Sequence, residues 1–159
     1  INGGDFSYIR TLGLNANGNG ILVQVYGEGT ELTINDGYFH DNASFAPGGG
    51  WGALVYLNRG GDFEMNGGVI EDTITNKCTA FVANAPTSIV LNGGTIHVDQ
   101  AYGKGFDALF CGDVTIGKDM VITADEDAVI AMLDEGGELE INNTIQGGTC
   151  RIWPALMRT

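Results

Sequence analysis

The sequence predicts an all-β protein, a right-handed parallel β-helix of about six coils that forms a single domain over residues 1–159. Three observations predict this fold: a repeat of 25 to 33 residues, short strands that alternate apolar and polar residues, and turns rich in glycine and asparagine. The chain has 26 glycines but 3 prolines, and its 43% hydrophobic content can fill a core. Because Ile1 lies inside the first repeat, we expect the domain to be a fragment of a longer repeat protein.

The repeat is an eight-residue pattern of apolar, any, apolar, Asn, small, Gly, any, apolar. It is complete at residues 32–39, 63–70 and 89–96, and weaker copies begin at Val114 and Leu139. The position of the asparagine marks each copy, at Asn2, Asn35, Asn66, Asn92, Gly117 and Asn142, with steps of 33, 31, 26, 25 and 25 residues. A drifting period of this size is typical of stacked coils that carry loops of different lengths.

A second strand recurs between these markers, and each copy is followed closely by Gly, Asn, Asp or Pro, which end strands. The copies cover residues 21–25, 53–57, 80–83, 108–111 and 128–132. A β-sandwich would need hairpin turns instead of one motif repeated at coil length, and a propeller blade would need about 40 residues or more. The repeat therefore favours a β-helix.

The asparagines predict a ladder at one corner of the stack. We expect their side chains to turn inward and to satisfy one another from coil to coil, at Asn2, Asn35, Asn66, Asn92 and Asn142, with an interruption at Gly117. The glycines that follow them allow backbone angles that a Cβ atom would forbid.

The net charge of −13 disfavours nucleic acid and anionic membranes as partners. No apolar run approaches the roughly 20 residues that cross a bilayer, so we expect no membrane insertion. The three cysteines, Cys78, Cys111 and Cys150, form no CxxC pair, which disfavours a zinc site. We expect them to be free and buried, with one long-range disulfide as the alternative.

Two short motifs carry a resemblance to known proteins. Residues 66–70 and 92–96 resemble the repeat of bacterial cell-surface adhesin-like proteins with a pectin-lyase-like β-helix, and residues 39–42 are similar to the Phe-x-x-Asn element of polymorphic outer-membrane proteins. This resemblance implies an exported, extracellular or cell-surface stalk whose loops contact a carbohydrate or a host surface ligand. It implies no catalytic residues.

The loop over residues 40–52 is the candidate binding site. Its aromatic residues Phe45 and Trp51 could stack on sugar rings, or they could fold back over the edge of the coil. His40 and His97 occupy corresponding positions of the repeat, where outward strand residues explain them better than catalysis does.

Acidic residues gather at positions 125–127 and 134–135, with Glu138 and Glu140 nearby. We interpret them as a solvated rim, because no calcium-loop motif is present, and we expect no cofactor; calcium in these turns is the alternative.

These observations favour a non-catalytic extracellular scaffold or adhesin-like module. The alternatives are a fragment of a pectate lyase-like or polygalacturonase-like enzyme, because the same fold carries both, and a phage tail-fibre segment that recognises polysaccharide. The chain has four arginines, and none of them lies in a recognisable catalytic motif: Arg10, Arg59, Arg151 and Arg158.

Overall fold

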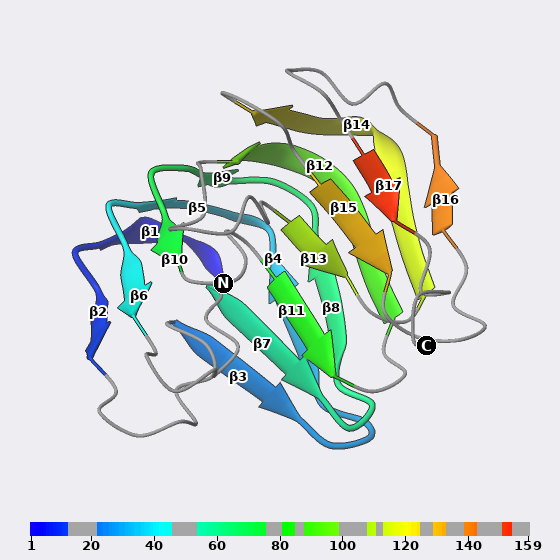
Figure 1. Ribbon diagram of the computed structural model, residues 1–159, viewed down its shortest axis with the longest axis horizontal. Coiled ribbons are helices and arrows are strands. Elements are labelled where there is room, and N and C mark those ends of the chain that lie inside the picture. The colour runs from blue at the N-terminus through cyan, green and yellow to red at the C-terminus, as the bar shows by residue number, and fades with distance from the viewer. Residues whose placement is uncertain are drawn as a thin grey trace.

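The protein is an all-β chain of parallel strands in the part that the computed structural model describes (Figure 1). The described residues are 1–12, 22–45, 54–75, 81–84, 88–98, 108–110, 113–124, 129–132, 139–142 and 151–153. None of them is helical, so this part of the chain has no helix that could span a membrane. Every strand pair among them is parallel, as the repeat predicts.

The largest sheet contains 8 strands. They are β1 (Asn2–Ser7), β4 (Glu31–Ile34), β5 (Asp36–His40), β8 (Asp62–Met65), β9 (Val69–Ile70), β12 (Ser88–Val98), β14 (Asp113–Ala124) and β16 (Leu139–Ile141). Its order is β1-β5-β9-β12-β14-β16, and β8 pairs with both β4 and β12. The long strand β12 therefore spans two faces, pairing with β8 through its first half and with β9 through its second half.

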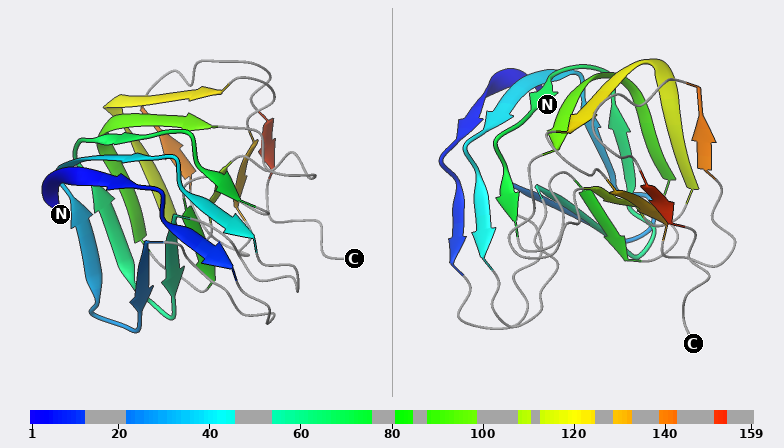
Figure 2. Two further views of the ribbon diagram at one scale, coloured as in Figure 1. Left: turned by 90° about the vertical axis from the view of Figure 1, so that its left-hand side faces the viewer. Right: turned by 45° about the horizontal axis from the view of Figure 1, so that its top comes forward.

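Three further sheets have 3 strands each. The first contains β2 (Arg10–Leu12), β6 (Ala43–Phe45) and β10 (Ile74–Thr75); the second contains β3 (Val23–Tyr26), β7 (Val55–Asn58) and β11 (Phe81–Asn84); the third contains β13 (Ala108–Phe110), β15 (Val129–Met132) and β17 (Arg151–Trp153). The large sheet curls round so that the smaller sheets face it, and together they nearly enclose the interior (Figures 1 and 2).

The strand register confirms the alignment of the eight-residue repeats. The first apolar position forms one column across the coils, with partners Leu32, Phe63, Ile89, Val114 and Leu139. The last apolar position forms another, with partners Phe6, Phe39, Ile70 and Ile96; in β14 a register shift of one residue after Leu91 places Ile122, instead of Val121, beside Ile96. Residues that are equivalent in the repeat are therefore neighbours in space.

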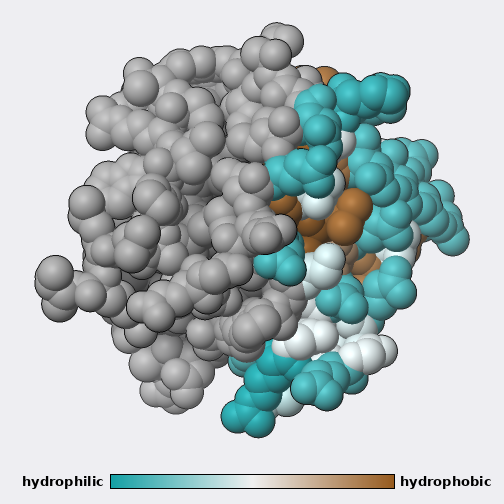
Figure 3. Space-filling model, turned by 90° about the vertical axis from the view of Figure 1, so that its right-hand side faces the viewer, coloured by the Kyte–Doolittle hydropathy of each residue, from teal (hydrophilic) through white to brown (hydrophobic). Residues whose placement is uncertain are grey.

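These columns make the core. Phe39 and Ile70 are completely buried, and the ring of Phe6 stacks on that of Phe39 with centroids 4.8 Å apart. Full burial of each such side chain stabilises the fold by about 1.5–3 kcal/mol. Along β5 the inward residues alternate with exposed ones, whereas residues 55–57 of β7 are all buried, so both faces of that strand are covered. On the described part of the face in Figure 3, hydrophilic residues surround a smaller hydrophobic area.

Candidate functional site

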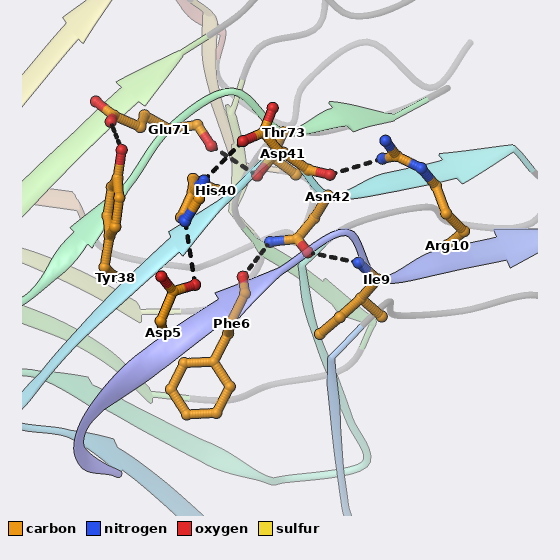
Figure 4. Close-up of polar contacts among 10 residues, drawn as sticks. All are labelled: Asp5, Phe6, Ile9, Arg10, Tyr38, His40, Asp41, Asn42, Glu71 and Thr73. Carbon is orange, nitrogen blue, oxygen red and sulfur yellow. Dashed lines mark hydrogen bonds and ion pairs between the residues drawn. The ribbon is translucent and has the colours of Figure 1, made fainter.

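Two corners of the coils carry most of the polar contacts between neighbouring coils. The asparagine corner lies between β4 and β5 and contains Asn2, Asn35, Asn66 and Asn92 with the residues that follow them. The histidine corner lies at the other end of β5, before β6, and contains residues 5–10, 38–42 and 71–73 (Figure 4).

At the asparagine corner, four side-chain amides form a continuous chain of hydrogen bonds. The Nδ2 of Asn35 donates to the Oδ1 of Asn2 at 2.8 Å, Asn66 donates to Asn35 at 2.9 Å, and Asn92 donates to Asn66 at 2.8 Å. Asn142 donates instead to Glu140 on its own strand, at 3.1 Å.

The prediction that these amides turn inward was wrong, because all five side chains are exposed. The preceding residues Ile34, Met65 and Leu91 point into the core. Since successive residues of a strand point to opposite sides, the asparagines that follow must point outward. The ladder therefore links the coils along the surface.

The predicted need for glycine at this corner is confirmed. Gly68 and Gly94 have φ angles of +90° and +106°. A Cβ atom on Gly94 would lie 2.8 Å from the carbonyl oxygen of Gly68 in the preceding coil, and one on Gly68 would lie 2.7 Å from that of Gly37. Neighbouring coils can approach this closely only where side chains are missing.

At the histidine corner, the ring of His40 lies between two carboxylates (Figure 4). Its Nε2 is 3.1 Å from Asp5 on β1, and its Nδ1 is 2.7 Å from Asp41, the residue after β5. Strand β1 places Asp5 opposite Tyr38, two residues before His40, so that Asp5 and His40 are diagonal neighbours on the outer face.

The same cluster includes two more side chains. The ring of Tyr38 stacks on that of His40 with centroids 4.0 Å apart and planes at 21°. Its hydroxyl donates to the carboxylate of Glu71 in the next coil. We call Asp5, Tyr38, His40, Asp41 and Glu71 the histidine cluster.

Hydrogen bonding shifts the pKa values of two of these groups. The bond from the hydroxyl to Glu71, helped by burial, raises the pKa of Tyr38 to about 12. The contact with Asp41 raises the pKa of His40 above its ordinary value of 6.5; burial opposes this rise, and Asp5 adds to it. The cluster thus favours the protonated form of both side chains.

The backbone of this corner turns sharply at one position in three successive coils. Tyr8, Asp41 and Asp72 have φ angles of +57°, +51° and +46°. Aspartate tolerates this left-handed conformation, whereas it is an outlier for a bulky residue such as Tyr8. The residue after Asp41 is Asn42, which the turn directs into the protein.

Asn42 is 0% exposed and joins two coils. Its Oδ1 accepts from the backbone N–H of Ile9 at 3.0 Å, and its Nδ2 donates to the carbonyl of Phe6 at 2.9 Å. From outside the turn, Arg10 donates to the carbonyl of Asp41 at 2.7 Å. The side chain of Asn42 therefore binds two backbone groups of the first coil, and one of them, the N–H of Ile9, lies between β1 and β2.

The two histidines share one outward column, as their repeat positions predict. His97 pairs with Thr123 on β14, and its Nδ1 is 2.8 Å from that hydroxyl. His40 lies two coils away, with Glu71 at the equivalent position between them.

Most other predicted sites fall outside the described residues, including Trp51, the three cysteines and acidic positions 125–127 and 134–135. Phe45 is described only as the end of β6, where it pairs with Leu12. In the described part of the chain, no three His, Cys, Asp or Glu side chains are grouped so that they could hold a metal ion.

Sequence reasoning missed the cluster around His40. Asp5, Tyr38 and Glu71 are separate in the chain, and only the repeat register could have placed them in adjacent coils. The Phe-x-x-Asn motif at residues 39–42 includes Asn42, but the motif did not predict that this side chain binds the backbone of the neighbouring coil.

Comparisons with protein-family models, curated proteins and solved structures give no significant match.

Proposed function

We propose that the chain is a right-handed parallel β-helix of about six coils that serves as a non-catalytic, adhesin-like scaffold on the outside of a bacterial cell. The observation that carries the proposal is the stacking of equivalent repeat residues in adjacent parallel strands, as in the column of Phe39, Ile70 and Ile96. A stack of this kind forms a stiff, extended surface from which loops project. The right-handed course is the one that crossover connections between parallel strands nearly always take.

The chemistry of His40 supports a structural role over catalysis. A general base needs a ring nitrogen that can accept a proton from a substrate. Both ring nitrogens of His40 instead contact carboxylates of the protein, Asp5 and Asp41. The proposed ligand is a carbohydrate or another host surface molecule, and the proposed contacts are Phe45 and Trp51.

The location is tested on intact cells that produce the full-length protein. Antibodies against this chain should bind these cells without lysis, and added protease should remove the signal. Binding that requires lysis would contradict the cell-surface location.

The non-catalytic role is tested by incubating the protein with pectin and polygalacturonate, with and without calcium. We expect no unsaturated products and no new reducing ends. Turnover of either polysaccharide by the wild-type protein would overturn the proposal. On a glycan array, Trp51→Ala should lose binding that Tyr26→Ala keeps; equal binding by both variants would exclude the loop as the contact.

A further inference from the structure

The histidine cluster joins the first coil to the second through one titratable ring. Asp5 belongs to β1, whereas His40 ends β5 and Asp41 follows it. The His40 side chain is 15% exposed, while those of Asp5 and Asp41 are 65% and 43% exposed. Stacking on Tyr38 holds the plane of the ring, so the ring cannot rotate freely away from its two carboxylates.

Counting donors and acceptors shows which form of His40 fits this position. An ionised carboxylate only accepts hydrogen bonds, and a protonated imidazole donates from both nitrogens. The protonated ring therefore satisfies Asp5 and Asp41 together. A neutral ring carries one N–H group, so one of its nitrogens would direct a lone pair at a carboxylate, which is repulsive.

The surrounding charges act in the same direction. Glu71 and Asp72 follow β9 in the third coil and, together with Asp41, act on Tyr38 beside the ring. The nearby cation is Arg10 after the turn of the first coil, which is bonded to the carbonyl of Asp41. When His40 is neutral, the carboxylates of the cluster thus lose the positive charge that lies between them.

We propose that His40 is a proton-operated latch that ties the first coil, β1–β2, to the second, β5–β6, when it is protonated and loosens this corner when it is neutral. The latch lies beside the bonds by which Asn42 holds Ile9 and Phe6, so its release should first affect the backbone of β1 and β2. Because His40 has a raised pKa in the folded protein, its contribution to stability is complete below about pH 6.5 and is lost as the pH rises through the folded value.

The chain offers an internal control in His97. His97 lies in the same outward column, and its Nδ1 faces the hydroxyl of Thr123, which can both donate and accept hydrogen bonds. The protein has 2 histidines, so an NMR titration follows two imidazole signals. A single histidine variant is enough to assign each signal to its residue.

The first test is this titration in the wild type and in Asp5→Asn, an exposed substitution. We expect a midpoint for His40 above 6.5 in the wild type and a downward shift in Asp5→Asn, because an amide can also satisfy the neutral ring. A wild-type midpoint at or below 6.5, or one that Asp5→Asn leaves unchanged, would overturn the latch.

The second test follows thermal unfolding from about pH 5 to about pH 9 in the wild type, His40→Gln and His97→Gln. The advantage in melting temperature of the wild type over His40→Gln should shrink as the pH rises, whereas His97→Gln should keep the pH dependence of the wild type. Amide exchange at Ile9, corrected for its intrinsic pH dependence, should accelerate over the same range in the wild type and in His97→Gln, but not in His40→Gln. Parallel pH curves for the wild type and His40→Gln would show that His40 does not control the corner.

Discussion

The two ends of strand β5 join neighbouring coils by opposite means. At the asparagine corner the same residue type recurs in successive coils, and its side chains are exposed. At the histidine corner the residues differ from coil to coil, and Asn42, the side chain that reaches furthest into the backbone network, is completely buried. The repeated asparagines therefore indicate how the coils are aligned, whereas the buried Asn42 should contribute more to the stability of the fold.

The largest expected effect comes from Asn42→Leu. The substitution removes the hydrogen bonds to the N–H of Ile9 and to the carbonyl of Phe6. The expected cost is about 2–6 kcal/mol, because each unsatisfied buried group costs about 1–3 kcal/mol. Chemical unfolding measures the loss. As a control, Asn142→Leu replaces an exposed amide that bonds its own strand, and it should change stability little. Equal effects of the two substitutions would remove the difference between the corners.

The second largest effect should come from Gly94→Ala, which should lower the free energy of unfolding by about 2–4 kcal/mol. The new Cβ atom would meet the Gly68 carbonyl at 2.8 Å, in a backbone conformation with φ at +106°. Gly27→Ala separates these two causes, because its φ is +100° and its Cβ would meet nothing within 4 Å. If both variants lose the same free energy of unfolding, the close approach of the coils contributes nothing.

Asn66→Ala should cost less, about 1 kcal/mol, although it removes two bonds of the ladder, because water can replace partners at an exposed site. The double variant Asn35→Ala and Asn66→Ala should cost less than the sum of the two single variants, since they share one bond. A strictly additive loss in chemical unfolding would mean that the amides act independently.

The smallest effect at neutral pH should come from Tyr38→Phe. In the wild type, Tyr38 should ionise near its pKa of about 12. A pH titration followed by phenolate absorbance should therefore show a late step near pH 12 that is missing in Tyr38→Phe. Because the folded pKa is raised, the stabilisation is present below about pH 10 and is lost as the pH rises through 12. Tyr26→Phe, on β3, should keep the late step. A late step that survives Tyr38→Phe would show that the hydroxyl of Tyr38 is not held by Glu71.

The repeat and the stacking of its apolar positions follow from the sequence alone. Equivalent apolar residues such as Phe39, Ile70 and Ile96 recur at matching positions, and stacking them is the arrangement that buries all of them at once. The sequence also determined that glycine must follow the asparagines, because the backbone conformation needed there is local.

Which polar side chains meet depends on the folded arrangement of the coils. Asp5, His40 and Glu71 come from three coils, and their contacts depend on how far each turn brings neighbouring strands together. The inward direction of Asn42 likewise depends on the turn at Asp41 that precedes it. A repeat pattern specifies which positions are equivalent, whereas the side-chain contacts depend on packing between coils that the pattern does not contain.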